Sequence, residues 1–336
     1  MGCSTDIKPQ RWEKLDLLRF ICSALVVYIH TPFTGTVGYT LSAIARIAVP
    51  LFFMLSGFFL MLSGSDKNLG KRLKRIAILI LIGFVISFSV ECFSQIVAGR
   101  SLITMIRRQV YYKSIFDMLV WNQPLFGDHL WYLFAYLFVI VITPVLRHKW
   151  VQPFAALLII GNLLLGTYAP VLFGRTFHLF LNRNWLFTGI PFVCLGMIFF
   201  RYKDFLMGLP SKLILLGILL FGVGSIAESA ILRATYGAPV GDVYISTVFL
   251  AVFVFVYLLD NKNLERKWIK SLAEIGRKHS LWIYILHPFV SLFFEKAAKI
   301  ILKTQLTYTK SLIVYLATLI LIVLFTKAVQ KLQHKQ

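Results

Sequence analysis

The amino-acid sequence predicts an all-α polytopic membrane protein with about ten transmembrane helices, both termini in the cytoplasm and no soluble domain. The composition indicates this class directly. The 336 residues are 58% hydrophobic and only 15% charged, whereas soluble domains carry about a quarter charged residues. Apolar runs that approach the ~20 residues of a membrane-spanning helix also recur along the whole chain.

Successive apolar runs define the predicted spans in chain order. Trp or Tyr stands near several ends, as at Trp131 and Trp185, which is typical of anchoring at the membrane interface. Several runs barely reach spanning length, so we expect tilted and partly broken helices. The predicted spans are 15–33, 41–62, 76–98, 128–146, 152–170, 185–200, 213–230, 243–259, 281–301 and 311–327. The chain then divides into a cytoplasmic N-terminal segment 1–14, a membrane domain 15–327 and a cytoplasmic tail 328–336.

Basic residues in the loops predict the orientation. The net charge is +21, and most loop Lys and Arg fall on one side when the N-terminus is placed in the cytoplasm, as the positive-inside rule requires. Membrane orientation explains this charge, so we expect no nucleic-acid binding. Loop 99–127 is the exception, because it is long and basic yet falls outside. We expect a partly ordered cap or re-entrant segment there, over an outward-facing cavity.

Cysteine usage gives no sign of a disulfide or a metal site. Three of the four cysteines lie in predicted spans, and none belongs to a C-x-x-C pair. We therefore predict no metal. No small-residue cleavage site follows the first apolar run, so we also expect no cleavable signal. The sequence leaves the oligomeric state open.

Polar residues form a stripe on the first predicted span. At 100° per residue, the eleven residues from Arg19 to His30 turn through three turns plus about 20° and rise about 16 Å, so both side chains share one face. Asp16 and Ser23 lie near the same line. Such a stripe points into the bundle or a wet cavity. A structural Asp16–Arg19 pair that locks helices together is the alternative interpretation.

Depth in the membrane sorts the other ionisable groups into two layers. Ionisable groups inside a membrane are costly and generally mark a functional path. Any one glutamate could instead serve as a hydrogen-bonding group between packed helices. The predicted outer layer holds His30, Arg46, Glu91, His129 and Glu228, and the inner layer holds Asp16, Arg19, Ser56 and His287.

Two basic clusters flank spans at the predicted inner surface. GKRLKRI carries Lys71, Arg72, Lys74 and Arg75, and GRKHS carries Arg277, Lys278 and His279. Positive-inside topology alone could produce both clusters. A phosphate-binding site is the alternative, because clustered Arg and Lys suit phosphates. Further along the second cluster's span, Tyr284 and His287 share one helical face.

Five stretches, in order, resemble the membrane-bound acyltransferase family 3, the integral-membrane O-acyltransferases of bacterial surface glycans. The resemblance covers residues 11 to about 290 and is greatest to the short stand-alone type. Each motif is weak, but the five together are fairly specific. The stretches are KLDLLRFICSALVVYIH, with the R-x(10)-H pattern, RIAVPLFFMLSGFFL, KRLKRI, HLWYLFAYLF and SLWIYILHPF.

The resemblance implies roles for particular residues. His30 and Arg19 would be the catalytic-motif pair, and Arg72, Arg75 and Lys71 would meet the phosphates of acyl-CoA. The K-R-L-K-R spacing departs from the tighter family pattern, so the acting basic residue is open. The family's frequent extracytoplasmic domain is not expected here. The resemblance implies an acyl-CoA-dependent O-acetylation in the bacterial cytoplasmic membrane, with acetyl-CoA as donor and a cell-surface or lipid-linked glycan as acceptor.

The predicted layers suit acyl transfer. A neutral histidine such as His30 can take the proton of a sugar hydroxyl, and Arg46 or Tyr284 could face the developing oxyanion. Ser56 fits small-residue packing better than a nucleophile, so direct transfer is favoured. Aromatic loops, including Tyr111 and Tyr112, would contact the sugar without specifying it.

Three other functions fit the same residues to different degrees. A proton-coupled secondary transporter or exporter of a small solute could use the same intramembrane groups as a relay, although no inverted repeat is evident. A variant of the family serves amino-acid uptake in serine-racemase fusions, and we expect no racemase part here. A structural scaffold would leave the polar stripe unexplained.

Overall fold

The computed structural model describes residues 11–64, 69–237, 241–260, 262–297 and 310–333, and every regular element in these ranges is helical. The first half of the chain contains α1 (Glu13–His30), α2 (Gly35–Ala45), α3 (Ala48–Leu62), α4 (Leu69–Val97), α5 (Leu102–Gln109), α6 (Tyr112–Trp121), η2 (Asp128–Leu130), α7 (Trp131–Leu146), α8 (Val151–Ala156) and α9 (Ile159–Leu165). The second half contains α10 (Ala169–Phe173), η3 (Leu179–Leu181), η4 (Trp185–Gly189), α11 (Ile190–Arg201), α12 (Lys203–Met207), α13 (Ser211–Tyr236), α14 (Ile245–Leu258), α15 (Lys267–Ala297) and α16 (Lys310–Gln333).

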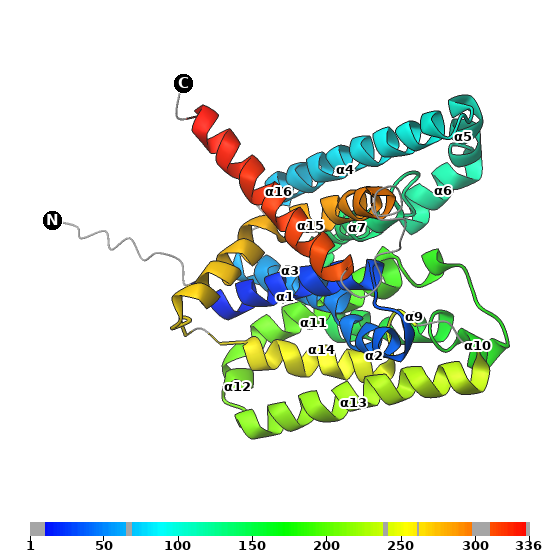
Figure 1. Ribbon diagram of the computed structural model, residues 1–336. Coiled ribbons are helices and arrows are strands. Elements are labelled where there is room, and N and C mark those ends of the chain that lie inside the picture. The colour runs from blue at the N-terminus through cyan, green and yellow to red at the C-terminus, as the bar shows by residue number, and fades with distance from the viewer. Residues whose placement is uncertain (1–10, 65–68, 238–240, 261, 298–309, 334–336) are drawn as a thin grey trace.

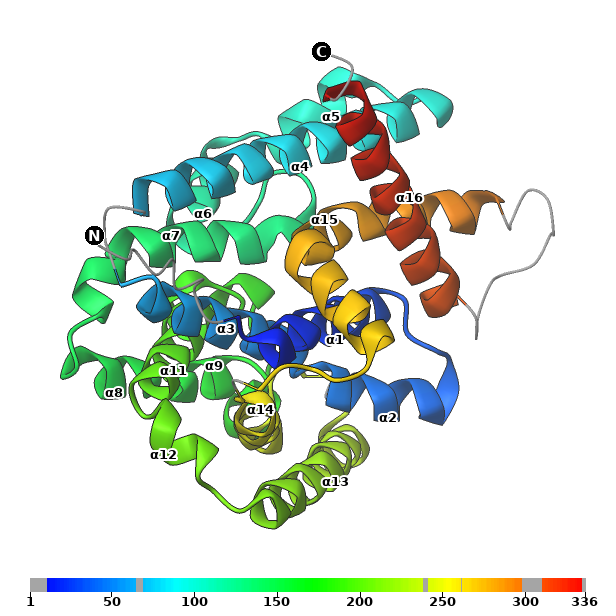
Figure 2. The ribbon, with the colours of Figure 1, turned by 90° about the vertical axis from the view of Figure 1, so that its left-hand side faces the viewer.

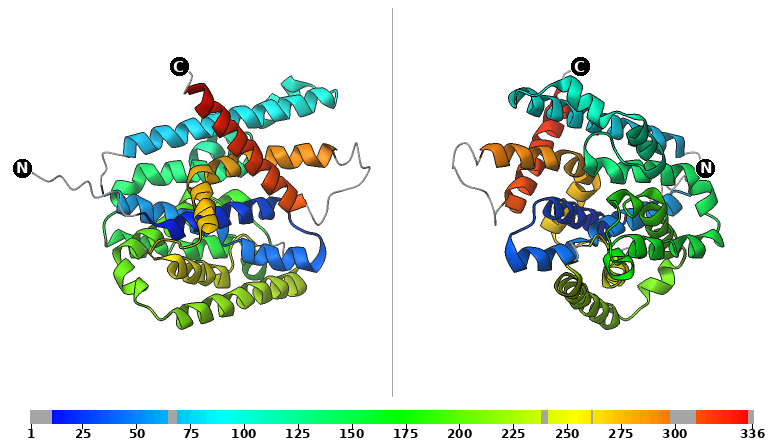
Figure 3. Two further views of the ribbon diagram at one scale, coloured as in Figure 1. Left: turned by 60° about the vertical axis from the view of Figure 1, so that its left-hand side comes forward. Right: turned by 90° about the vertical axis from the view of Figure 1, so that its right-hand side faces the viewer.

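Most of the long helices lie roughly along one common axis (Figure 1). α4 lies at one edge of the bundle and α13 at the opposite edge, with α1, α3 and α11 between them (Figure 2). α16 crosses the bundle at a steep angle, and α15 bends partway along its length (Figure 3). This arrangement is the helical bundle that the sequence predicts.

Four helical stretches in the described residues are long and apolar enough to cross a membrane. Side chains on the two edge helices are exposed and apolar, as at Leu81 and Val85 on α4 and Leu219 and Leu220 on α13, which is the surface that lipid accepts. The molecule is thus a helical multi-pass membrane protein. The four stretches are Gly35–Leu62, Leu69–Val97, Asp128–Leu146 and Ser211–Tyr236, with shorter apolar helices at Val151–Leu165, Trp185–Arg201, Ile245–Leu258 and Lys310–Leu324.

The exact count of ten spans and the cytoplasmic termini stay predictions. Most of the predicted N-terminal segment, residues 1–10, lies outside the described residues, as does the end of the tail, 334–336. The last residues of the predicted span 281–301 fall outside them too.

Several apolar helices are interrupted, as predicted. α2 ends at Ala45 and α3 begins at Ala48, so Arg46 lies at the break between them. The chain is also π-helical over Trp185–Gly189, directly before α11. Irregular backbone at membrane depth is tolerated where it is buried in protein or lines a cavity. At the short break between α2 and α3 the side chain of Arg46 is 15% exposed, so the break is enclosed by protein.

α1 lies at the centre of the core, packed against α15 and α3. Leu15, Leu18 and Cys22 on α1 are fully buried. Gly276 of α15 lies so close to the α1 backbone that an added Cβ would overlap the carbonyl oxygen of Asp16. A larger residue there would push the two helices apart. The polar residues of α1 are thus held by close helix packing on both sides.

The 99–127 segment is ordered. Ser101 caps α5 by accepting a hydrogen bond from the backbone N–H of Thr104 at 3.4 Å. α6 ends at Trp121, and the residue that follows, Asn122, has a left-handed φ of 54°. Its buried amide donates to the carbonyl of Trp131 at 3.2 Å and accepts from the N–H of Trp185 at 2.8 Å. The segment is therefore fastened to α7 and η4, and its place outside the membrane stays a prediction.

Candidate functional site

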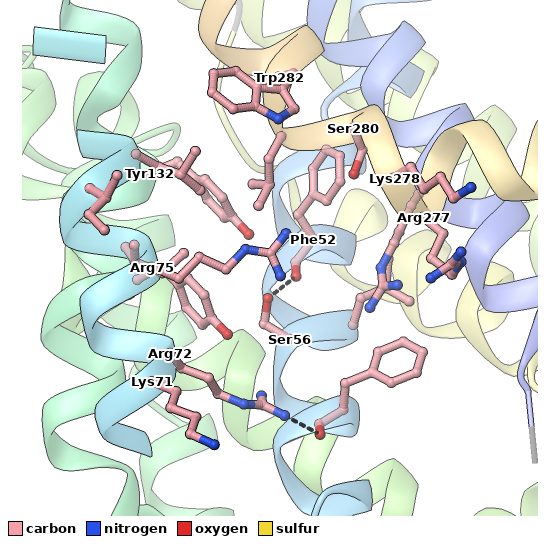
Figure 4. Close-up of a pocket in the computed structure, with 18 of the residues that line it drawn as sticks. Phe52, Ser56, Lys71, Arg72, Arg75, Tyr132, Arg277, Lys278, Ser280 and Trp282 are labelled. Carbon is pink, nitrogen blue, oxygen red and sulfur yellow. Dashed lines mark hydrogen bonds between the residues drawn. The ribbon is translucent and has the colours of Figure 1, made fainter. Parts of the chain in front are cut away.

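A large cavity, here called the inner cavity, opens among α1, α3, α4, α7 and α15. Its volume is about 890 Å³, within the range of ~300–1,000 Å³ typical of small-molecule sites. Aromatic and aliphatic side chains such as Phe52, Phe59 and Trp282 form much of the wall. Figure 4 shows this cavity with the basic side chains that enter it. A ligand here would meet both apolar surface and positive charge.

Arginines and lysines of both basic clusters predicted at the inner surface line the inner cavity, whereas His279 does not. Arg72 and Arg75 extend from α4 toward α3 (Figure 4). The Nη2 of Arg72 also donates to the carbonyl of Phe59 at 3.3 Å, which orients the guanidinium. Clustered cations with oriented guanidinium groups are suited to bind phosphates. The basic residues that line the cavity are Arg19, Lys71, Arg72, Lys74, Arg75, Arg277 and Lys278.

Arg19 lines the inner cavity while paired to Asp16. Its Nη1 donates to the Asp16 carboxylate at 2.8 Å, and its guanidinium carbon lies 4.1 Å from the centroid of the Phe59 ring. Asp16 is buried and also accepts from Arg11 at 3.4 Å. The pair considered in the sequence is therefore present. It holds Arg19 against the cavity wall, with the side chain 23% exposed.

Glu274 organises the two basic residues that α15 contributes. Arg277 Nη2 donates to its carboxylate at 2.5 Å, and Lys278 Nζ lies 2.9 Å from it. Arg11 reaches the same carboxylate at 2.6 Å. Hydrogen bonds from Arg277 and Lys278 lower the pKa of Glu274 from 4.5 to about 2. The carboxylate is thus ionised at neutral pH and fixes the positions of both cations.

A second, smaller pocket of about 70 Å³ lies at the helix break and is here called the outer pocket. His30 and Arg46, which were predicted at similar depth, both line it. Tyr132 lines the outer pocket and the inner cavity alike, so one side chain lies between them. α1 therefore presents Arg19 to the inner cavity and His30 to the outer pocket. The other lining residues are Val26, Ile29, Val49, Pro50, Trp131, Asn162, Arg183, Thr188, Asp242, Val243 and Tyr284.

An ion cluster forms one wall of the outer pocket. Arg183 binds Asp242 through Nε and Nη2, both at 2.6 Å. Arg46 donates through Nη1 to the same carboxylate at 2.9 Å, and Asn182 adds a contact at 3.3 Å. The carboxylate thus accepts from two guanidinium groups. Two cations and one anion leave one positive charge unmatched within this cluster.

Three histidines and a tyrosine meet beside the outer pocket. The ring centroid of His287 lies 5.0 Å from that of His30 and 5.9 Å from that of His129. His129 also lies 5.9 Å from Tyr284. The hydroxyl of Tyr284 and the Nε2 of His287 are buried and have no hydrogen-bond partner in the described part of the chain. These two polar atoms are therefore buried and unpaired within the described residues.

The placement of His287 corrects the predicted layers. It was predicted in the inner layer, yet its ring contacts those of the outer histidines. The predicted span began at residue 281, but α15 begins at Lys267. His287 lies about 30 Å along the helix from that start, at 1.5 Å per residue. The Nδ1 of His287 lies 3.1 Å from the carbonyl oxygen of Ile283. In the tautomer in which Nδ1 carries the proton and donates to that carbonyl, Nε2 carries the lone pair.

Two glutamates predicted for the outer layer do not line either cavity. Glu91 accepts a hydrogen bond from Gln95 on its own helix at 2.6 Å. Glu228 accepts from the backbone N–H groups of Ile245 and Ser246 at 3.2 and 2.9 Å, which caps α14. The prediction that both belong with the cavity candidates is corrected. The prediction grouped them with the cavity residues because their depths in the membrane are similar. In the structure, α4 and α13 place them at the edges of the bundle.

Three residues that line the outer pocket were not predicted from the sequence. Arg183 and Asp242 lie in loops just before predicted spans, and nothing in their local sequence shows that they meet 59 positions apart. The only available signal was an ionisable residue at the entrance of an apolar run. Tyr132 lies within the HLWYLFAYLF stretch, next to the predicted interface residue Trp131, and the sequence alone assigned it no role.

Comparison with known proteins identifies the relatives of this chain. A family model described as "Acyltransferase domain" matches residues 12–327. A protein from Enterococcus faecalis described as "Amino-acid racemase" is 25% identical over 350 residues, which cover 96% of this chain and 47% of that protein. A second protein of the same description and organism is 28% identical over 133 residues, covering 38% of this chain and 17% of its own length. The chain thus spans about half the length of the first relative and less of the second. No solved structure matches.

Proposed function

This chain belongs to acyltransferase family 3, and on that premise we propose that it transfers an acetyl group from acetyl-CoA to a hydroxyl of a cell-surface or lipid-linked glycan. The observation that carries the proposal is the pair of cavities that meet at Tyr132. The larger one is basic and suits a nucleotide phosphate donor. The smaller one holds His30 and suits the reacting hydroxyl.

The donor would occupy the inner cavity. CoA carries several phosphates, and Arg72, Arg75 and Lys71 would bind them by charge-assisted hydrogen bonds. The apolar walls from Phe52 and Trp282 would cover the acyl-bearing arm. That arm would pass Tyr132 to bring the thioester carbon to the outer pocket. In a bacterial cytoplasmic membrane the inner cavity would face the cytoplasm, where acyl-CoA is found.

His30 would act as general base for a direct transfer. It takes the proton of the acceptor hydroxyl as the hydroxyl oxygen attacks the thioester carbonyl. The tetrahedral oxyanion then collapses, the carbon–sulfur bond breaks, and the imidazolium returns the proton to the CoA thiolate. The Tyr284 hydroxyl, buried without a partner in the described residues, would donate a hydrogen bond to the oxyanion. Ser56 already donates to the carbonyl of Phe52, which fits a packing role.

Arg19 would hold the donor rather than take part in proton transfer. Its guanidinium lines the inner cavity and is already fixed by Asp16 and by the ring of Phe59. A residue in this position can meet the inner part of the donor arm with little loss of conformational entropy. The spacing between Arg19 and His30 then separates donor binding from base catalysis along one helix.

A radiolabel transfer assay tests this function. Purified protein is mixed with acetyl-labelled acetyl-CoA and a panel of glycan acceptors, and wild type is compared with H30A and H178A. We expect transfer by wild type and H178A and a loss of ~10²–10⁴-fold in H30A. His178 is the matched control because it stacks on Phe180 and lines neither cavity.

The same preparations separate acyl transfer from transport. If no acceptor is acylated while proteoliposomes accumulate a small solute in a His30-dependent way, the enzyme proposal is wrong. That outcome would favour a proton-coupled secondary transporter or exporter.

A further inference from the structure

The ion cluster of the outer pocket holds a positive charge that no residue of the pocket wall neutralises. Arg46 and Arg183 share the single carboxylate of Asp242. Among the described residues that line the pocket, Asp242 is the only acid. Asp128, outside the pocket lining, adds negative charge near Arg183, so Arg46 carries the positive charge that is least offset at the pocket wall.

Arg46 has donors that the cluster leaves unused. Its Nη1 is occupied by Asp242, while its Nε is buried and has no partner in the described part of the chain. Arg183, in contrast, donates hydrogen bonds to Asp242 from both Nε and Nη2. The edge of a guanidinium formed by Nε and Nη2 is the one that binds a carboxylate or phosphate in two parallel hydrogen bonds. On Arg46 the Nε of that edge makes no hydrogen bond in the described residues.

We propose that the acceptor carries a carboxylate or phosphate group close to its reacting hydroxyl, and that Arg46 binds this group in the outer pocket. The inference rests on the proposed function and names its acceptor class as anionic. Arg46 and His30 line the same small pocket of about 70 Å³, so a group bound by Arg46 lies close to a hydroxyl placed beside His30. The anionic group and the hydroxyl therefore lie on the same sugar or on directly neighbouring atoms of the acceptor.

Arg46 acts here as a specificity-determining residue. A neutral sugar offers Arg46 only hydroxyl oxygens, which accept weaker hydrogen bonds than the oxygens of an ionised carboxylate or phosphate. A cationic sugar would be repelled by the cluster. A site built to hydrogen-bond a particular substrate group discriminates against analogues that lack that group. Asp242 positions the two guanidinium groups and offsets one of the two charges.

Three acceptors that share one sugar ring and differ in the group at C6 test the proposal. They are a methyl glucoside, the matching methyl glucuronoside and the glucoside 6-phosphate, each given to purified protein with labelled acetyl-CoA. We expect kcat/KM for at least one anionic acceptor to exceed that of the glucoside by tenfold or more. Comparing kcat/KM for the glucuronoside with kcat/KM for the 6-phosphate identifies whether the pocket prefers a carboxylate or a phosphate. Equal use of the three acceptors, or preference for the neutral one, overturns the proposal.

Variants connect that preference to Arg46. R46Q should reduce the ratio of kcat/KM for anionic acceptors to kcat/KM for neutral acceptors about tenfold. R46K keeps the positive charge but lacks the paired N–H donors of a guanidinium, so it should reduce this ratio less. R233Q is the matched control, because Arg233 lies over the ring of Tyr39, outside both cavities. It should leave the ratio unchanged. A uniform loss in R46Q with the ratio preserved would show a structural role and would refute the proposal.

Direct binding keeps this test separate from that of the proposed function. Each acceptor is added to wild type and R46Q without donor, and the shift in Tm is measured. If no acceptor is acylated, a stabilisation by the anionic acceptors that R46Q and not R233Q abolishes still supports the anion site. The acyl-transfer function alone would then be refuted. Equal Tm shifts for charged and neutral acceptors overturn the anion site whatever the transfer assay shows.

Discussion

Replacing Arg72 and Arg75 together by glutamine tests the cationic wall of the inner cavity. Both side chains reach toward α3 across that cavity. A hydrogen bond to a charged group contributes ~1.5–3 kcal/mol, but Arg75 is exposed and Arg72 only half-buried. Solvent screening lowers each contribution to about 1 kcal/mol. The double variant should thus lose about 2 kcal/mol of acyl-CoA binding, which is ~30-fold in Kd.

Titration calorimetry of acetyl-CoA in detergent measures this change. The matched control is K212Q/R266Q, which removes two exposed basic side chains that do not line the cavity. We expect its Kd to stay within about twofold of wild type. Raising NaCl from about 0.05 to 0.5 M shortens the Debye length and should weaken wild type more than R72Q/R75Q.

A donor that lacks one phosphate sharpens the assignment. If Arg72 and Arg75 bind that phosphate, its removal from CoA should weaken wild type and affect R72Q/R75Q little. The reasoning is refuted if the double variant and K212Q/R266Q raise Kd by the same factor, or if neither raises it. Either result would mean that positive-inside topology explains the cluster and that the phosphates bind elsewhere.

Three further predictions follow from individual side chains. Y284F should lower kcat about 10²-fold without lowering Tm, because the lost hydroxyl has no partner in the described structure; a drop in Tm with kcat retained would contradict this. G57A should lower Tm strongly, since an added Cβ would overlap the Val193 carbonyl and overpacking costs ~1–3 kcal/mol, whereas G70A, with open space around it, should be neutral or stabilising. Glu274 has its pKa lowered to about 2, so it contributes stability above pH 4.5 that is lost as the pH falls toward 2; the Tm of wild type should therefore fall more steeply from pH 5 to 3 than that of E274Q, and parallel curves would contradict this.

Much of the architecture could be predicted because lipid leaves few choices. Backbone groups in the membrane must bond within their own helix, so long apolar runs such as 76–98 become helices like α4. Helical periodicity alone also showed that Arg19 and His30 share a face, since 100° per residue holds on any straight helix. The basic motif at the start of α4 was likewise visible as a local cluster.

Rotation between helices is the part that the sequence does not encode locally. Depth placed Glu91 and Glu228 beside His30, but packing turned them toward Gln95 and the start of α14. Helix length was a second source of error, because polar residues before a span can still be helical, as the early start of α15 shows for His287.

The sequence by itself determined a helical membrane protein with a polar stripe on its first span and a basic cluster at the start of the third. Only the tertiary structure decided which groups meet: Arg19 with the cations of α4 and α15, His30 with Arg46, and Arg183 with Asp242. The physical reason is that periodicity and hydropathy act within one helix, whereas a cavity arises from side-chain packing between helices far apart in the chain.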